Sequence, residues 1–90
     1  MPKTFQLNIV LPETPTPART VAALDIPADS GRITLLANHQ PIIAAIRPGL
    51  MTITLEDGTR EQWTLSAGAL QMEHNTATLL VREAMQRAAE

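Results

Sequence analysis

The feature that most constrains this chain is a regular alternation of apolar and polar residues that recurs in short runs. In TFQLNIV (4–10) every second residue is apolar, and the same period of two recurs in LMTITL (50–55) and EQWTLS (61–66). A period of two places successive side chains on opposite faces of a β-strand, whereas an amphipathic helix needs apolar residues three or four positions apart. The pattern therefore predicts half-buried strands.

Turn-forming residues separate these runs at short intervals. EDGT (56–59) joins two alternating runs, and Asp-Gly tolerates the positive φ that a tight hairpin requires. ADSG (28–31) and HN (74–75) predict further turns. The three prolines of PETPTP (12–17) cannot pair within a central strand, so they predict an edge or an extended connection. Further strands are predicted at 20–26, 32–36, 41–46, 69–73 and 76–81.

Closely spaced strands of this kind predict an antiparallel β-sandwich or flattened barrel of about eight to ten short strands. A chain of 90 residues has material for a single core, and we place the sandwich at 1–82. The tail at 83–90 predicts a short helix, or the start of a C-terminal region, because it is rich in alanine and places Glu83 and Arg87 four residues apart. So short a helix is marginal unless something packs against it.

Composition argues against several classes of site. The chain has no cysteine, which excludes disulfides and thiolate metal sites, and its net charge of −2 gives no electrostatic reason to bind nucleic acid or an anionic membrane. Its two histidines, His39 and His74, lie far apart and lack a nucleophile motif or clustered carboxylates. The sequence therefore predicts no catalytic residue, no cofactor and no metal site, and a small hydrolase is disfavoured.

The segment LANHQPIIAAIRPG (36–49) leaves two questions open. Composition alone favours a loop side chain at His39 that stabilises an irregular turn, with an interface contact as the alternative. The run IIAAI fits a core strand buried on both sides, but its small residues Ala44 and Ala45 would also let an internal sheet or a partner helix approach closely.

The order of motifs resembles the N-terminal β-sandwich domain of the epsilon subunit of F-type ATP synthases, which is named delta in mitochondria. In that family the central segment reads approximately G-x-x-P-G-H-x-P-L-L-x-x-L-x-P-G, followed by a Ser-Gly-Gly turn and a closing V-T-V-L strand. The resemblance runs from about Phe5 to Arg82. The residues that match are His39, Pro41, Pro48 and Gly49 in the central segment, and Ser66 and Gly68 in the later turn.

Three departures from the family pattern are informative. Ala37 and Asn38 replace the usual Pro-Gly, but Asn enters the left-handed region more readily than most residues, so the turn can survive. Ala67 replaces the middle residue of Ser-Gly-Gly, which is a mild change if its φ is negative. Arg32 stands where the family often has an acid, and we expect a correspondingly altered polar loop on the partner.

The resemblance implies a non-catalytic rotor subunit of the central stalk, which links gamma to the c-ring and couples ion translocation to ATP synthesis or hydrolysis. It implies a peripheral location at the cytoplasmic face of the bacterial inner membrane, with membrane association only through the complex. For the c-ring interface it indicates Asp29, Ser30, Gly31 and Arg32, and for the gamma interface Leu11, His39, Ile43 and Ala44.

Many bacterial members of the family continue into a C-terminal helical hairpin that restrains ATP hydrolysis and in some members binds ATP. This sequence stops at Glu90, so we expect no hairpin within it, whether the chain is naturally short or shortened. The alternative function is a free-standing β-sandwich module that binds a peptide or a small ligand through an open edge strand. Association with gamma and c subunits would distinguish the two.

Overall fold

The computed structural model describes residues 4–87, and within this range it contains ten strands and no helix. Hydrogen bonding joins all ten into one continuous sheet in the order β10-β7-β6-β3-β5-β8-β9-β1-β2, with β4 paired to β3 beside this path. The strands are β1 (Phe5–Val10), β2 (Arg19–Val21), β3 (Ala23–Ala28), β4 (Gly31–Leu36), β5 (Ile42–Ile46), β6 (Gly49–Thr54), β7 (Arg60–Leu65), β8 (Gly68–Glu73), β9 (Thr76–Val81) and β10 (Ala84–Gln86).

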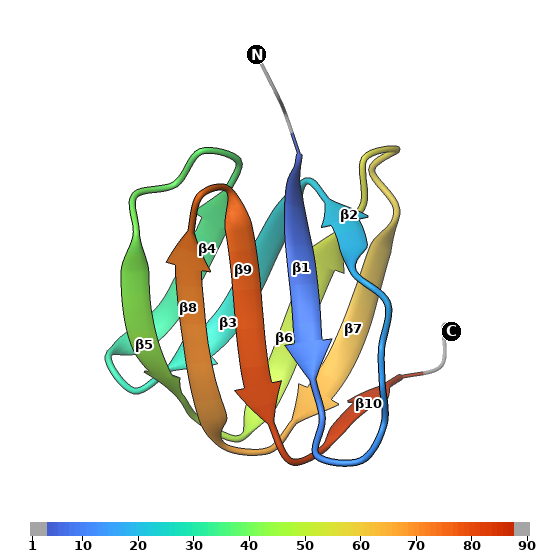
Figure 1. The fold of residues 1–90 in the computed structure, drawn as a ribbon, viewed down its shortest axis with the longest axis vertical. Coiled ribbons are helices and arrows are strands. Elements are labelled where there is room, and N and C mark those ends of the chain that lie inside the picture. Colours follow the sequence, from blue (N-terminus) through green and yellow to red (C-terminus); the bar gives the residue numbers. More distant parts are fainter. Residues whose placement is uncertain (1–3, 88–90) are drawn as a thin grey trace.

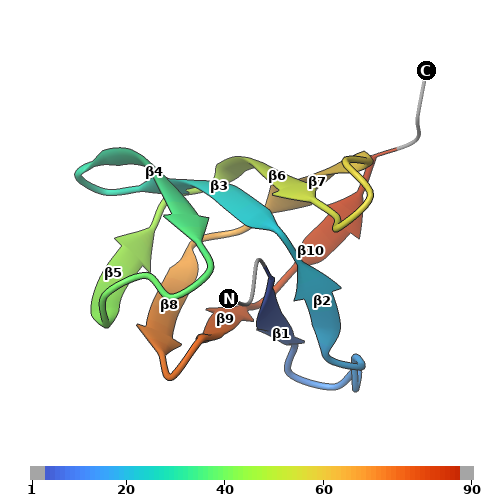
Figure 2. The ribbon, with the colours of Figure 1, turned by 90° about the horizontal axis from the view of Figure 1, so that it is seen from above.

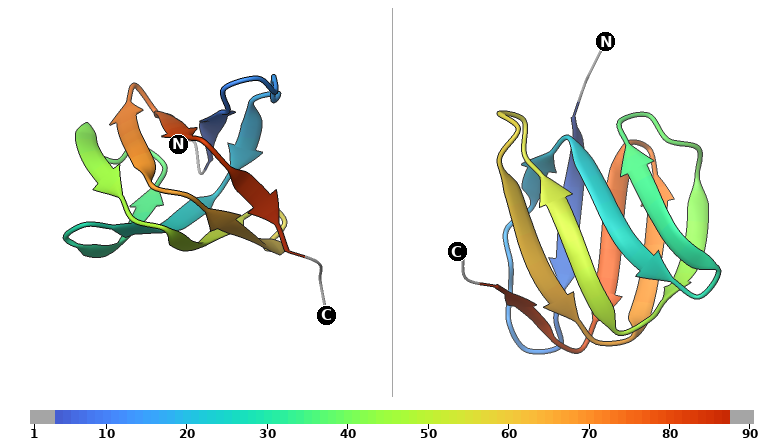
Figure 3. Two further views of the ribbon diagram at one scale, coloured as in Figure 1. Left: turned by 90° about the horizontal axis from the view of Figure 1, so that it is seen from below. Right: turned by 180° about the vertical axis from the view of Figure 1, so that it is seen from behind.

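The continuous sheet curls over into two facing layers (Figures 1 and 2). The front layer contains β5, β8, β9, β1 and β2, and the back layer, seen from behind in the right panel of Figure 3, contains β4, β3, β6, β7 and β10. β3 is the turning point, since it pairs with β4 and β6 in the back layer and its last residue, Ala28, pairs with Ile46 of β5. The predicted all-β fold is therefore confirmed, in the form of a curled ten-stranded sheet.

The core lies between the layers and is made of the inward half of each alternating run. Every buried side chain among the described residues is apolar, and the largest come from both layers. Removing this apolar surface from water, at roughly 25 cal/mol per Å², is the main stabilising contribution. The fully buried large side chains are Phe5, Leu7, Val21, Leu24, Ile26, Leu35, Met51, Ile53, Leu70, Met72 and Leu79.

The predicted strand at 20–26 is two strands, and Ala22 separates them. β2 ends at Val21 in the front layer, and β3 begins at Ala23 in the back layer. The N–H of Ala22 donates to the carbonyl oxygen of Thr54, with an N–O distance of 2.7 Å, so the back layer already holds the chain at this point. Val21 and Leu24 are both buried, whereas Ala22 and Ala23 between them are only partly buried, so the alternation shifts by one residue at the crossing. All four residues are apolar, which is why the sequence pattern shows no break.

The prediction of a fully antiparallel sheet is wrong at one pair of strands. β1 and β9 run parallel, in a register that places Gln6 opposite Thr76 and Val10 opposite Leu80. Alternation specifies which side chains face the core, but it carries no information about strand direction. A strand from the beginning of the chain can therefore enter beside the last long strand in either sense.

The predicted helical tail is also wrong over the residues that the structure describes. Ala84–Gln86 form β10, which pairs antiparallel with β7, and the N–H of Arg87 donates to the carbonyl oxygen of Gln62 at 2.8 Å. An isolated short helix must overcome a costly nucleation step, whereas the edge of β7 offers backbone partners already in place. The sheet thus continues past Arg82, and residues 88–90 of the predicted tail lie outside the described range.

A paired charge cluster joins the two layers along the side where the curled sheet would otherwise be open. Arg19 of β2 donates two hydrogen bonds to the carboxylate of Glu61 in β7, at 2.6 and 2.7 Å. The indole N–H of Trp63 donates to the same carboxylate at 3.2 Å, and the guanidinium of Arg19 lies 5.9 Å from the centroid of the Trp63 ring. These bonds from Arg19 lower the pKa of Glu61, and the bond to Glu61 raises the pKa of Arg19.

Among residues 4–87, the structure contains no helix of the length and apolarity needed to cross a membrane.

Candidate docking surfaces

The outer face of the front layer carries a row of apolar side chains. Ala45 of β5 lies opposite Ala69 of β8, Ala69 lies opposite Leu80 of β9, and Leu80 lies opposite Val10 of β1. Leu80 is 50% exposed and Val10 is 43% exposed. One row further along the strands Ile43 is 82% exposed. We define the front apolar surface as Val10, Ile43, Ala45, Ala69 and Leu80.

This surface is unusual for the outer side of a two-layered β protein. The solvent-facing side of such a sheet normally carries polar residues, and a contiguous exposed apolar patch marks a contact with another molecule. Shallow hollows adjoin it at both ends, one lined by Leu11 and Leu80 and the other by Pro41, Ile43 and Gln71. The two alanines add little bulk, so a partner backbone could approach closely there.

The outer face of the back layer is different, because its outward residues are mostly polar. Thr34 of β4 lies opposite Asp25 of β3, Asp25 lies opposite Thr52 of β6, and Thr52 lies opposite Gln62 of β7. The exposed large apolar side chains of this face lie at its two edges, Leu36 of β4 at 55% exposure and Met85 of β10 at 73%. This face shows the alternation expected where one side of a sheet meets water.

The structure places one of the predicted gamma-interface residues on the outer face of the front layer and turns two others toward the core. Ile43 belongs to the front apolar surface, whereas Leu11, which follows β1, is partly buried and packs against the core. Ala44 packs against the core, because neighbouring residues of a strand point to opposite faces. Ala45 takes the outward position beside Ile43, and the period of two could have identified it from the sequence.

β5 also resolves the question of the IIAAI run. It is not buried on both sides, since Ile46 is buried in the core while Ile43 faces out. Of the two interpretations left open for this run, the strand buried on both sides is therefore wrong, and the apolar character of the outward residues has no explanation within the domain itself.

His39 lies in the loop between β4 and β5, at the upper end of the front layer in Figure 1. The preceding residue, Asn38, has φ of 63°, which confirms that Asn adopts the left-handed conformation expected of it. The imidazole is exposed, and the N–H of His39 donates to the carbonyl oxygen of Leu36 at 3.2 Å. Ala67, in the later turn, does not have a positive φ, so its replacement of Gly is the mild change expected.

The turn predicted to face the c-ring lies at the opposite end of β4. Asp29 and Ser30 are exposed, and Gly31 has φ of 120°, a conformation that favours glycine. Arg32 is held against the back layer, because its Nε donates to Asp25 Oδ1 and its Nη2 to the carbonyl oxygen of Leu50, both at 2.8 Å. The freely presented charge of this turn is therefore that of Asp29.

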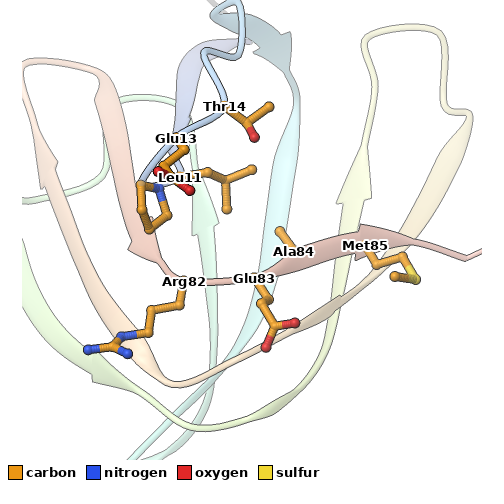
Figure 4. Close-up of a pocket in the computed structure, with 8 residues that line it drawn as sticks. Leu11, Glu13, Thr14, Arg82, Glu83, Ala84 and Met85 are labelled. Carbon is orange, nitrogen blue, oxygen red and sulfur yellow. The ribbon is translucent and has the colours of Figure 1, made fainter.

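A pocket lies between the proline-rich segment and β10 (Figure 4). Leu11 and Ala84 contribute apolar atoms to it, while the side chains of Arg82 and Glu83 diverge rather than meet at a common point. Within residues 4–87, no group of three His, Cys, Asp or Glu side chains is arranged to hold a metal ion.

Comparison with known proteins identifies the family. Residues 4–87 match the model of the ATP synthase delta/epsilon chain β-sandwich domain. The chain is 35% identical over 86 residues to the ATP synthase epsilon chain of Dichelobacter nodosus, covering 96% of this chain and 59% of that protein. It is 32% identical over 85 residues to the epsilon chain of Sinorhizobium medicae, covering 94% of this chain and 63% of that protein.

Solved structures show the same fold. A chain of the mitochondrial ATP synthase of Euglena gracilis, in a structure of OSCP, F1 and c-ring, superposes with a TM-score of 0.89 at 22% identity, over 96% of this chain and 55% of that one. A chain from the central stalk and c-ring of the Tetrahymena thermophila mitochondrial enzyme gives 0.71 at 10% identity, over 89% and 64%. The chain spans about three fifths of the length of the curated relatives it matches. By this match over nearly all of its length, the chain belongs to the ATP synthase delta/epsilon family and corresponds to the β-sandwich domain of that family.

Proposed function

We propose that this chain acts as an epsilon-type subunit in the central stalk of an F-type ATP synthase, where it links gamma to the c-ring without catalysing a reaction itself. The single observation that carries the proposal is the front apolar surface in a domain of this family. A stalk component needs contact surfaces for its neighbours on a stiff body, and the chain offers two such surfaces. In this role it couples ion translocation to ATP synthesis or hydrolysis.

The front apolar surface is the proposed contact with gamma. Ile43 is its most exposed member, and burying an aliphatic side chain of this size contributes about 1.5–3 kcal/mol. Ala45 and Ala69 leave room for a backbone beside it. His39 lies exposed in the loop that leads into β5, and Leu11 lines the hollow beside Leu80, so both adjoin this surface.

The turn Asp29–Arg32 is the proposed contact with the c-ring. It lies at one end of β4 and the loop of His39 lies at the other, so the six residues of the strand separate them by about 20 Å. β4 is paired along its whole length with β3, which keeps this separation fixed. Rotation imposed at one end can therefore reach the other without being lost in a flexible linker.

The proposed location follows from the partners. The subunit associates with the membrane only through the complex, at the cytoplasmic face of the bacterial inner membrane. Its net charge of −2 supplies no attraction of its own to anionic lipid.

The gamma contact is tested with Ile43→Asp and, as a matched control, Thr34→Asp on the outer face of the back layer. Both positions are exposed in strands, so neither change should unfold the domain. We expect Ile43→Asp to weaken binding to purified gamma by about tenfold or more, measured by biolayer interferometry, because a charge would be buried in an apolar contact. Equal affinities for the two variants would contradict the proposal. If the unchanged chain bound neither gamma nor the c-ring, the free-standing binding module would be favoured.

The c-ring contact is tested with Arg32→Glu and Asp29→Asn. Arg32→Glu places a second acid beside Asp25, so Arg32→Gln serves as the control for lost internal bonds. We expect Arg32→Glu to bind the cognate c-ring less tightly than Arg32→Gln at low salt, and the difference to shrink at high salt. Unchanged affinity for all three variants at low salt would remove this turn from the interface.

A further inference from the structure

Asn75 connects three segments that are distant in the sequence. It lies in the turn between β8 and β9, and its side-chain oxygen accepts a hydrogen bond from the N–H of Asn38 at 2.7 Å. Its side-chain amide donates to the carbonyl oxygen of Thr4 at 2.9 Å, and its own carbonyl oxygen accepts from the N–H of Gln6 at 3.2 Å. The turn, the start of β1 and the β4–β5 loop therefore meet at this one residue, at the upper end of the front layer in Figure 1.

The β4–β5 loop has little else to define its shape. Among the described residues it is stabilised by the bond from the N–H of His39 to the carbonyl oxygen of Leu36, at 3.2 Å, and by the bond between Asn38 and Asn75. Asn38 is in the left-handed region, which is unfavourable for a residue with a side chain. The bond to Asn75 offsets this cost, and its position next to His39 sets the direction in which the loop presents the imidazole.

We propose that Asn75 is a positioning residue, which holds the β4–β5 loop in the conformation that presents His39 to a partner docked on the front apolar surface. The inference rests on the proposed function, because it assumes that gamma binds this end of the front layer. It adds that the shape of the contact is maintained by a residue that itself belongs to another turn.

Asparagine suits this position for two chemical reasons. The N–H of Asn38 requires an acceptor and the carbonyl of Thr4 requires a donor, and an amide side chain supplies both at once. The residue also adopts φ of 58°, which Asn tolerates better than most residues. Aspartate would supply the acceptor for Asn38 but no donor for Thr4, and glycine would supply neither while keeping the backbone conformation.

The first experiment measures amide hydrogen exchange by NMR in the full chain and in the variants Asn75→Gly, Asn75→Asp and His74→Gly. His74 is the matched control, because it is the neighbouring turn residue, has φ of 52° and is exposed. We expect the Asn38 amide to exchange about tenfold faster in Asn75→Gly, and close to its original rate in Asn75→Asp and His74→Gly. The amide of buried Leu79 reports global opening, so a change confined to Asn38 separates the loop from overall stability. An Asn38 rate unchanged in Asn75→Gly would overturn the inference.

The second experiment measures binding of the same variants to purified gamma, with Ile43→Asp alongside. A loop that spends less time in the bound conformation raises the apparent Kd in proportion, so we expect Asn75→Gly to weaken binding by about three- to tenfold and Asn75→Asp to restore most of it. If Ile43→Asp weakens binding and Asn75→Gly does not, the positioning role is wrong although the proposed function stands. If neither weakens binding, the proposed function fails, and a faster Asn38 exchange would show only that Asn75 shapes the loop.

Discussion

The two outer faces of the domain are built from the same kind of strand and differ in what they present. On both, every second residue points into a shared core, so the inward residues are alike. Outward, the front layer has one apolar row that ends in Leu80 and Val10, beside polar residues such as Gln71 and Thr78. The centre of the back layer presents Thr52 and Gln62, and its exposed large apolar side chains, Leu36 and Met85, lie at its two edges. The fold requires only the inward residues, so the outward ones reveal where a partner is expected.

The choice of small residues strengthens this contrast. Threonine is favoured in strands and suits a face that meets water, which accounts for Thr34 and Thr52 in the back layer. Alanine is a poor strand former, so strand propensity does not account for Ala45 and Ala69 in the middle of the front layer. Close approach of the partner proposed above would account for them.

The largest expected effect concerns the glycine that begins a strand in each layer. A Cβ added to Gly68 of β8 would lie 2.0 Å from the carbonyl oxygen of Leu80, whereas one added to Gly49 of β6 would lie 3.3 Å from a side-chain carbon of Pro27. We expect Gly68→Ala to lower the free energy of unfolding by about 3 kcal/mol, because β8 and β9 would have to separate, and Gly49→Ala by about 1 kcal/mol. Urea unfolding of both variants measures the difference, and equal losses would show that the front layer is no more tightly constrained than the back.

The second prediction concerns the charge cluster that joins the layers. Glu61→Gln replaces a bidentate carboxylate with a neutral amide, so we expect a loss of about 1.5 kcal/mol in the free energy of unfolding at neutral pH. The folded-state pKa of Glu61 is lowered by Arg19, so the stabilisation is complete above the unfolded pKa of about 4.3 and is lost as the pH falls through the lower folded pKa.

The variant should therefore lose less stability than the original chain between about pH 5 and pH 3. Asp57, whose pKa is lowered by the backbone N–H of Thr59, leaves a residual pH dependence in both. Thermal unfolding across this range is the measurement. If the stability of the variant and of the original chain fell in parallel over this range, Glu61 would not be stabilised as a carboxylate by Arg19. The cluster would then not couple the front layer to the back.

The third prediction concerns the loop that passes from the back layer to the front. Asn38→Ala keeps the N–H that bonds to Asn75 but places a Cβ without a polar group at φ of 63°. We expect a loss of about 1 kcal/mol, and little change in Asn38→Gly, because glycine adopts this conformation freely. Chemical unfolding of both variants tests this, and equal stability of the two would show that the conformation is not costly here.

The smallest effect on stability is expected from a matched pair on the two faces. Leu80 in the front layer and Leu36 in the back layer are about equally exposed, so Leu80→Thr and Leu36→Thr should each change the free energy of unfolding by about 0.5 kcal/mol or less. Their binding should differ, because only Leu80 belongs to the front apolar surface. If Leu36→Thr weakened the binding of gamma and Leu80→Thr did not, the back layer rather than the front layer would be the gamma-binding face.

Sequence reasoning predicted what depends on local chemistry. The strand at Thr76–Val81 was predicted to the residue, and the turns at 56–59 and 74–75 follow from Asp-Gly and from residues that accept positive φ. It failed where the outcome depends on a distant partner. The crossing at Ala22 is set by a bond to Thr54, and the short strand Ala84–Gln86 is set by the free edge of β7.

The residues of the candidate docking surfaces also fall into two groups, those whose position the sequence could predict and those whose contacts it could not. The interface role of Ile43 stays a prediction, and its exposed position in the strand agrees with it. The period of two, applied from Ile43, would have selected Ala45 rather than Ala44 as the next outward residue. The internal bonds of Arg32 could not be predicted, because Asp25 and Leu50 come beside it only after β3, β4 and β6 pair. A motif identifies a position in a strand or turn, but only the assembled sheet decides whether the side chain is free.

The bond between Arg19 and Glu61 has a mechanical consequence. A curled sheet with one open side behaves like a slit tube, which twists easily because its two long edges slide past each other. β2 lies along one edge, and the part of β7 that β10 leaves unpaired, with Glu61, lies along the other. Two short hydrogen bonds between Arg19 and Glu61 resist this sliding. A closed section resists torsion far better than a slit one. In the stalk role proposed above, this single ion pair between two strands would help the domain to turn as one rigid piece.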